Sequence, residues 1–509
     1  NARRHKIGES CSSPHFWSQM SSIKDQPISN DTEASDLSTS YDSNSSVESS
    51  LSDNHKMYNK LKRQGSRSSV LASNSNRSIS KSIDTQKQVA LEGPDTKTWS
   101  RHKKHFFILS SAGKPIWTRY GDESGTSSLM GVIQAIVSFF QDDDDSPRCM
   151  NAGHHKFVFQ LKGPLYLVAV AKTGESETHL RDQLLYLHSQ ILSVLTSQQL
   201  TKIFEQRINF DLRRLLSGTE IFLDSLSTLF NNDHGFMLGA LQCLRVSKIL
   251  RDQVGNALAE GRVKNLLYGM IVSNGKLVTL LRPKKHSLHP SGSHNLHLLF
   301  NMLTGSTTFR TAESWTPLCL PKLNSKGFLH AYICYIERDT CVVMISTNKD
   351  SFFDISDWKR QIVEVRDNDD KLTKSEALAK LQKAADDSYS ASDIGIPSLR
   401  HFIYKSKLHV QFTCPELEAP YTNTISRRRL YRLYQRTHDR LHSKTRPLKL
   451  YYLAGSHETV LGWITSSFEL YVVFGPNVPN STVITSSNHL LRWIKKHEDL
   501  LFILNSPVF

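Results

Sequence analysis

The sequence predicts three small α/β modules of the α+β type, each an antiparallel sheet flanked by helices, preceded by a disordered arm. Three observations support this fold class. The chain has 509 residues, which is too long for a single hydrophobic core. A pattern of hairpin, helix, strands and helix recurs three times after residue 98. The composition before that point differs from the composition of the rest.

The arm is predicted over residues 1–98. The stretch 31–54 is mostly Ser, Asp, Thr and Asn, and 60–87 alternates serines with basic residues. Neither stretch holds enough apolar side chains to offset the entropy lost on ordering, so we expect disorder. Its serines are candidate phosphorylation sites, each adding up to ~2 negative charges. An unregulated tail is the alternative interpretation.

The first module is predicted over residues 99–240. A hairpin opens it, because Gly113 lies in a turn between the β-prone runs 106–109 and 115–117. Helical spacing of apolar residues and alternation with period two predict the elements that follow. They are a helix at 129–140, strands at 156–161 and 165–171, and helices at 177–195 and 197–204.

The second and third modules, at 241–395 and 396–509, repeat this pattern. Asn274 and Gly275 mark the hairpin of the second module, and a shorter hairpin at 401–412 opens the third. The second module continues with a helix at 295–303, strands at 328–336 and 340–346, and helices at 353–365 and 373–385. The third continues with a helix at 426–441, strands at 448–453, 460–465 and 469–474, and a helix at 487–504. We expect antiparallel sheets, each covered by helices on one face.

Composition narrows the class of protein. No stretch approaches ~18 uninterrupted apolar residues, so no transmembrane helix is expected. The seven cysteines are odd in number and contain no CxxC pair, which argues against a disulfide framework and favours a reducing compartment. The first residue is Asn1 rather than Met, which indicates a trimmed or partial chain. These features predict a cytoplasmic protein.

Positive charge is concentrated in the third module. The net charge is +15, and residues 421–450 hold nine Lys or Arg against the single acid Asp439. In the helix at 426–441, which Ser426 is expected to cap, four arginines repeat every four residues. Like charges at this spacing cost stability, so an anionic ligand surface would explain them better than solvent alone. The membrane-binding candidates are Arg428, Arg432, Arg436, Arg440, Lys444 and Arg446. A solvated helix face and nucleic-acid binding remain the alternatives.

Enzyme signatures are absent from the sequence. It contains no GxxxxGK[ST], GxGxxG, GxSxG or HExxH motif, so no catalytic residue and no cofactor is predicted. The aspartates at 142–145 lack the spacing of a calcium loop. The histidines His286, His289, His294 and His297 lie in a Ser/Gly/Pro-rich loop without a nearby Cys or carboxylate, so no metal site is predicted.

Several long motifs carry a resemblance to a known family. The segments 99–110 (WSRHKKHFFILS), 112–117 (AGKPIW) and 119–121 (RYG) resemble the opening of the Mon proteins. These are the monensin-sensitivity subunits of the Mon–Ccz complex. Further matches are 165–170 (LYLVAV), 174–176 (GES), 211–213 (DLR), 216–220 (LSGTE) and 490–496 (LLRWIKK). The resemblance covers residues 99–509 and leaves the arm unmatched.

The resemblance implies three longin domains and an obligate heterodimer with a Ccz subunit. The pair would act as a guanine-nucleotide exchange factor for the late-endosomal Rab GTPase of the Rab-seven type, in endosome maturation, lysosomal or vacuolar fusion and autophagy. It would be recruited peripherally to these membranes through an anionic or phosphoinositide surface and an upstream early-endosomal Rab. Whether a third subunit joins stays open. A longin-type tether or adaptor without exchange activity is the alternative.

In the family, the first longin modules of the two subunits form the platform for the GTPase. The GTPase-contact candidates on this chain are therefore Trp117 in the first hairpin and Met130, Gln134 and Val137 in the helix that follows. We expect Met130 and Gln134 to be exposed. Trp117 and Val137 could equally belong to the core.

Overall fold

The computed structural model describes residues 96–508, apart from 123–124, 261–262, 285–289, 311, 337–338, 364–379, 382 and 384–387. The chain divides into two compact units. The first contains the residues up to Leu185 together with Thr201–Glu220, and the second contains Tyr186–Leu200 and Ile221–Phe509. Nearly all of the predicted arm, His286, His289 and most of the predicted helix at 373–385 lie outside the described residues.

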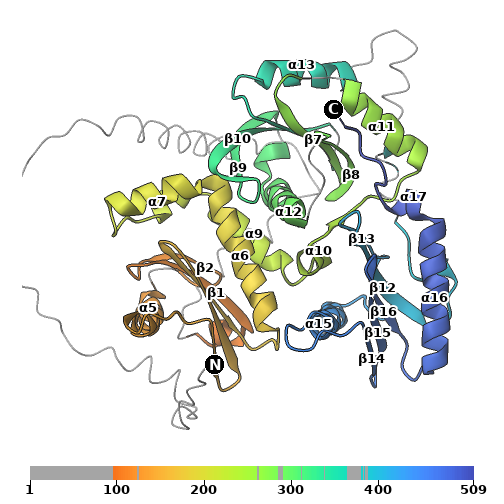
Figure 1. The fold of residues 1–509 in the computed structure, drawn as a ribbon, viewed down its shortest axis with the longest axis horizontal. Helices are drawn as coiled ribbons and strands as arrows, with labels where there is room; N and C mark the ends of the chain where they lie inside the picture. Colours follow the sequence, from red (N-terminus) through yellow and green to blue (C-terminus); the bar gives the residue numbers. More distant parts are fainter. Residues whose placement is uncertain are drawn as a thin grey trace, which may run out of the picture. The chain divides into compact units, whose positions relative to one another are not determined.

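The first unit is built on a five-stranded antiparallel sheet of order β2-β1-β5-β4-β3. The strands are β1 (Lys104–Ser110), β2 (Pro115–Thr118), β3 (Cys149–Ala152), β4 (His155–Lys162) and β5 (Leu165–Ala171). The hairpin around Gly113 is confirmed, with Ile108 opposite Trp117. Helices α5 (Ser127–Asp142) and α6 (Glu177–Val194) lie on opposite sides of this sheet (Figure 1). The short helices α4 (Lys97–Arg101) and α8 (Arg213–Leu216) complete this unit.

A buried ion pair lies on the α6 side of this sheet. Lys104 at the start of β1 places Nζ 2.8 Å and 3.0 Å from the two carboxylate oxygens of Glu175, and 3.2 Å from Oε1 of Gln183. Burial alone would raise the pKa of Glu175, but the positive charge of Lys104, the neighbouring His179 and hydrogen bonds from Lys104 and Thr173 together outweigh it. The pKa of this carboxyl group is therefore lowered to about 2.

The second unit contains two further sheets. One has the order β8-β7-β11-β10-β9 and is antiparallel throughout. Its strands are β7 (Leu266–Ser273), β8 (Lys276–Leu281), β9 (Ser314–Leu320), β10 (Asn324–Tyr335) and β11 (Thr340–Ser346). Asn274 and Gly275 form the predicted tight turn, with φ of 50° and 70°, which is why a residue pair tolerant of positive φ occupies it.

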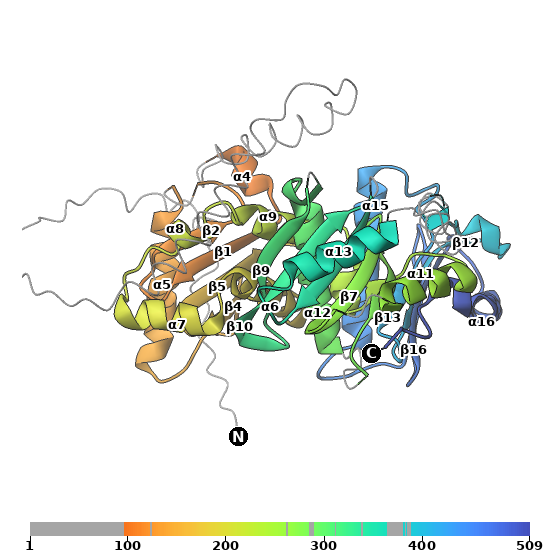
Figure 2. The same cartoon turned by 90° about the horizontal axis from the view of Figure 1, so that it is seen from above.

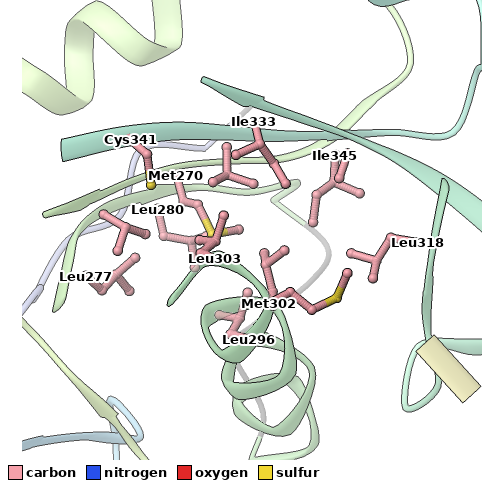
Figure 3. Packing of buried hydrophobic residues seen from close by; sticks show 14 of the residues in the cluster. Met270, Leu277, Leu280, Leu296, Met302, Leu303, Leu318, Ile333, Cys341 and Ile345 are labelled. Atoms are coloured by element: carbon pink, nitrogen blue, oxygen red, sulfur yellow. The ribbon is translucent and has the colours of Figure 1, made fainter. Parts of the chain in front are cut away.

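Helices cover both faces of this sheet. From α12 (Pro290–Gly305), Met302 and Leu303 point towards Met270, Leu280 and Ile333 of the strands (Figure 3). A second buried cluster, which includes Ile271, Tyr332 and Met344, fills the opposite face. The helices α11 (Lys248–Glu260) and α13 (Phe352–Val363) run across that face (Figure 2). Between this sheet and α6 along the chain come α7 (Ser197–Gln206), α9 (Glu220–Leu229) and α10 (His234–Leu238).

The third sheet has six strands in the order β14-β15-β16-β12-β13-β6. Five of them come from the C-terminal part of the chain: β12 (Leu399–Ser406), β13 (Gln411–Thr413), β14 (Leu450–Ala454), β15 (Thr459–Ile464) and β16 (Phe468–Phe474). The sixth, β6 (Leu241–Gln242), precedes the second sheet in sequence and pairs in parallel with β13. Helices α15 (Thr424–Leu441) and α16 (Asn480–Lys496) lie on opposite faces of this sheet, and α17 (Glu498–Leu501) follows (Figure 1).

The expectation that helices cover only one face of each sheet is therefore wrong. Every residue of β1, β5 and β11 is buried, because side chains on both faces contact helices. Near-continuous apolar strands are typical of sheets covered on both sides. The fold class of three helix-flanked sheets is confirmed. The domain boundaries at 240 and 395 stay predictions.

Candidate functional site

The basic helix α15 is fixed to the third sheet by its start and by its apolar stripe. It begins two residues earlier than predicted, at Thr424. Its cap is Asn423, whose side chain accepts a hydrogen bond from the Ser426 N–H at 2.8 Å, so the assignment of Ser426 as the cap is wrong. Leu430, Tyr434 and Leu441 are buried against the sheet.

The helix packs unusually close to β15. Gly462 faces it, and a Cβ at this position would lie 2.5 Å from Cγ2 of Thr437. The helix is also anchored at its middle, where the Tyr431 hydroxyl donates a hydrogen bond to the Phe230 carbonyl at 2.9 Å. The orientation of α15 is therefore set by contacts along its length, and with it the direction of its charged side chains.

The predicted row of arginines points away from this anchored face. Arg428, Arg436 and Arg440 are exposed, and Arg432 is half-buried. Lys444 and Arg446 are exposed in the loop after the helix. Among the described residues none of these six has an ion-pair partner within 4 Å, whereas the neighbouring Arg429 pairs with Glu458. We call these six residues the basic row. Its contact with a membrane stays a prediction.

Three of the four GTPase-contact candidates of the first unit are buried. Met130 and Val137 are fully buried in the core between α5 and the sheet, and Trp117 is buried in β2. The prediction that Met130 is exposed is therefore wrong. Gln134 is half-buried, and its amide donates to Ser138 at 3.3 Å. In this conformation these three buried side chains are not accessible to another protein.

The outward face of α5 consists of other residues. Gly131, Ala135 and Phe139 are exposed at helical spacing, and the Phe139 side chain is 65% exposed. The helix ends at Asp142, and the exposed aspartates 143–145 follow it. This face combines small residues, the large apolar side chain of Phe139 and an acidic end.

Comparison with known proteins gives one matching family model for each of the three sheets. Models of the first, second and third longin domains of FUZ, MON1 and HPS1 match residues 104–226, 264–364 and 398–498, respectively. The chain is 45% identical over 415 residues to the vacuolar fusion protein MON1 homolog A of Gallus gallus, covering 81% of this chain and 74% of that protein. The chain belongs to the MON1 family.

Other MON1 relatives extend this likeness. The human MON1 homolog A is 45% identical over 412 residues, which is 80% of this chain and 62% of that protein. The vacuolar fusion protein MON1 of Cryptococcus neoformans (strain B-3501A) is 41% identical over 434 residues, which is 84% of this chain and 68% of that protein. Within this chain, α5 lies in the first longin domain and the basic row in the third. Among the described residues, no helix has both the length and the apolar character needed to cross a bilayer.

The histidines considered as a metal site in the sequence make other contacts where the structure describes them. The His294 ring stacks on Tyr186 with 3.9 Å between centroids, and His297 Nε2 lies 3.0 Å from the Ala240 carbonyl oxygen. Both histidines therefore have structural roles within α12. A different group, His438, His442 and Glu469, brings three potential ligand atoms within 4.8 Å of one another. Its only signal in the sequence is the four-residue spacing of the two histidines.

Proposed function

We propose that this chain is a subunit of a guanine-nucleotide exchange factor that activates the late-endosomal Rab GTPase of the Rab-seven type. The observation that carries the proposal is the match to MON1 relatives through all three longin domains. Those relatives are named vacuolar fusion proteins. From the resemblance to the Mon–Ccz complex, we propose a Ccz protein as the second subunit and obligate partner. An upstream early-endosomal Rab is a further proposed partner.

Exchange requires binding energy rather than covalent catalysis. An exchange factor binds the GTPase best when the nucleotide site is distorted. By linkage, it weakens nucleotide binding by the same coupling free energy by which bound nucleotide weakens binding of the factor. The reaction therefore needs a rigid surface of the right shape. The α5 face is rigid, because Met130, Ile133 and Val137 fix the helix to the sheet beneath it, and this supports its role in the proposal.

Within this proposal, Phe139 is the GTPase contact of this subunit. An exposed aromatic side chain surrounded by small residues fits a pocket on a partner and contributes more to affinity than its flat surroundings. Gln134 keeps its place as a candidate at the edge of this face, since it is half-buried. Met130 and Val137 support the face from beneath, whereas Trp117 pairs with Ile108 and lies on the other face of the sheet.

We propose that the basic row holds the complex on an anionic leaflet that contains phosphoinositides. Each basic side chain near such a surface contributes ~1 kcal/mol. Six bases without ion-pair partners among the described residues, on an anchored helix and its following loop, support this assignment. Membrane and GTPase would then be bound by different domains of one chain.

The test is the rate of GDP release from the purified Rab with this chain alone, with the Ccz subunit alone and with the pair. We expect acceleration only from the pair. Phe139→Ser should reduce this acceleration at least tenfold, whereas Ile208→Ser should not. Ile208 is a suitable control because it is an equally exposed apolar residue of the first unit. No acceleration by the pair would favour a tether, and full acceleration by this chain alone would refute the need for the partner.

A further inference from the structure

The C-terminal end of α15 faces a buried carboxylate in the third sheet. His438 in the last turn of the helix and the C-cap residue His442 lie four positions apart, with 4.2 Å between their ring centroids. Glu469, near the start of β16, is almost fully buried, and its Oε2 lies 3.1 Å from His442 Nε2. These three side chains come from two elements that pack against each other in the same domain.

We propose that His438, His442 and Glu469 bind one Zn²⁺ ion. Two imidazole nitrogens and one carboxylate oxygen are a common donor set for Zn²⁺, and a water molecule completes the tetrahedron. Bonds of about 2.0–2.2 Å at tetrahedral angles hold the ligand atoms about 3.3–3.5 Å apart. The His442–Glu469 distance of 3.1 Å is already close to that spacing. The ion would replace the proton that now joins the two side chains.

The groups around Glu469 leave one oxygen for the metal. Lys405 Nζ lies 3.2 Å from Oε1 and also donates to the Leu238 carbonyl at 2.7 Å, so it stays on that side of the carboxylate. The Tyr471 hydroxyl donates to Oε2 at 3.0 Å. A carboxylate oriented by a second hydrogen bond is typical of metal ligands. Oε2 can therefore bind Zn²⁺ through its other lone pair.

The neighbouring ammonium groups of Lys405 and Lys407 set the selectivity. They repel any cation, so only a metal with strong bonds to nitrogen can bind there. Mg²⁺ and Ca²⁺ require several oxygen ligands, and this cluster offers one carboxylate. Bound Zn²⁺ would fix the last turn of α15 to β16, directly before Lys444 and Arg446 of the basic row.

The experiment uses the full chain, stripped of metal and titrated with Co²⁺ and then with Zn²⁺. We expect one equivalent of Co²⁺ with the intense visible absorption of a tetrahedral site, displaced by Zn²⁺ and not by Mg²⁺. His442→Ala should lose this equivalent and weaken Zn²⁺ binding at least tenfold. His442 is exposed, so its removal should leave the circular dichroism spectrum unchanged.

His489→Ala is the matched control, since His489 is an exposed histidine on α16 at the opposite face of the same sheet. His438→Gln provides a second, independent ligand variant. The proposal is overturned if both ligand variants bind Zn²⁺ as the unaltered chain does, or if His489→Ala loses the same equivalent. Both readouts measure metal binding alone, so they are independent of whether the chain acts in nucleotide exchange.

Discussion

Replacing Arg428, Arg432, Arg436 and Arg440 with Gln tests the basic row directly. The substitutions keep the buried stripe of α15 and remove four positive charges. Each charge near an anionic leaflet contributes ~1 kcal/mol. The three exposed arginines alone contribute about 3 kcal/mol of membrane-binding free energy, so their loss should lower vesicle partitioning roughly 10²-fold. A full contribution from Arg432 would raise this loss towards 10³-fold.

The assay is sedimentation with vesicles that contain phosphatidylserine and a phosphoinositide, at several salt concentrations. Raising the ionic strength should reproduce the effect, because screening weakens exposed charges most. GDP release in solution should stay nearly normal, since the proposed GTPase face lies in another domain. A second quadruple variant of the same charge supplies the control, at exposed lysines of the second longin domain and its margins: Lys248, Lys264, Lys322 and Lys349. Equal loss from both variants, or no loss from the arginine variant, would refute the reasoning.

Three further predictions concern stability. Lys104→Met leaves the buried Glu175 carboxylate without its cation and should lower the free energy of unfolding, measured by chemical denaturation, by about 3–5 kcal/mol. Adding Glu175→Gln should recover much of this loss. An unchanged denaturation midpoint would contradict the ion pair. The pKa of Glu175 in the folded chain is lowered to about 2 from 4.5, so the contribution of its ionised form to stability is complete above pH ~4.5 and is lost as the pH falls towards 2. The difference in unfolding free energy between the unaltered chain and Glu175→Gln should shrink over that range. A constant difference would disprove this pH dependence. Gly462→Ala should lower the free energy of unfolding by about 1–3 kcal/mol through overpacking against Thr437. Adding Thr437→Ser removes the methyl group in contact and should restore part of the lost melting temperature. The absence of any rescue would point to another cause.

Features with a local cause could be predicted from the sequence. The hairpins at Gly113 and Asn274–Gly275 follow from turn chemistry, which a few adjacent residues decide. The arginine face of α15 follows from helical periodicity, because charged side chains avoid a packed interface. Strands β3 and β9 were missed. The first is short and only partly buried, and the second contains Pro317, which is tolerated there because β9 forms the edge of its sheet.

Features set by tertiary contacts could not be predicted. Apolar residues occupy more than half the circumference of α5, so hydrophobicity alone did not show that Met130 packs inward while Phe139 faces outward. The sheet beneath the helix decides between them. The approach of Glu469 to His438 likewise depends on how β16 lies beneath α15, which no spacing along the chain reveals.

The two-residue strand β6 has a consequence for synthesis of the chain on the ribosome. Gln242 contacts Cys414, a residue 172 positions later. At translation rates of about 5–20 residues per second, β6 waits roughly ten to thirty seconds for its partner strand to emerge. During that interval the whole second sheet is made and can close, while the third lacks every strand but this one. In the growing chain, β6 is therefore attached to the second longin domain before the other strands of the third sheet have been made. A truncated chain that ends before residue 411 leaves β6 exposed.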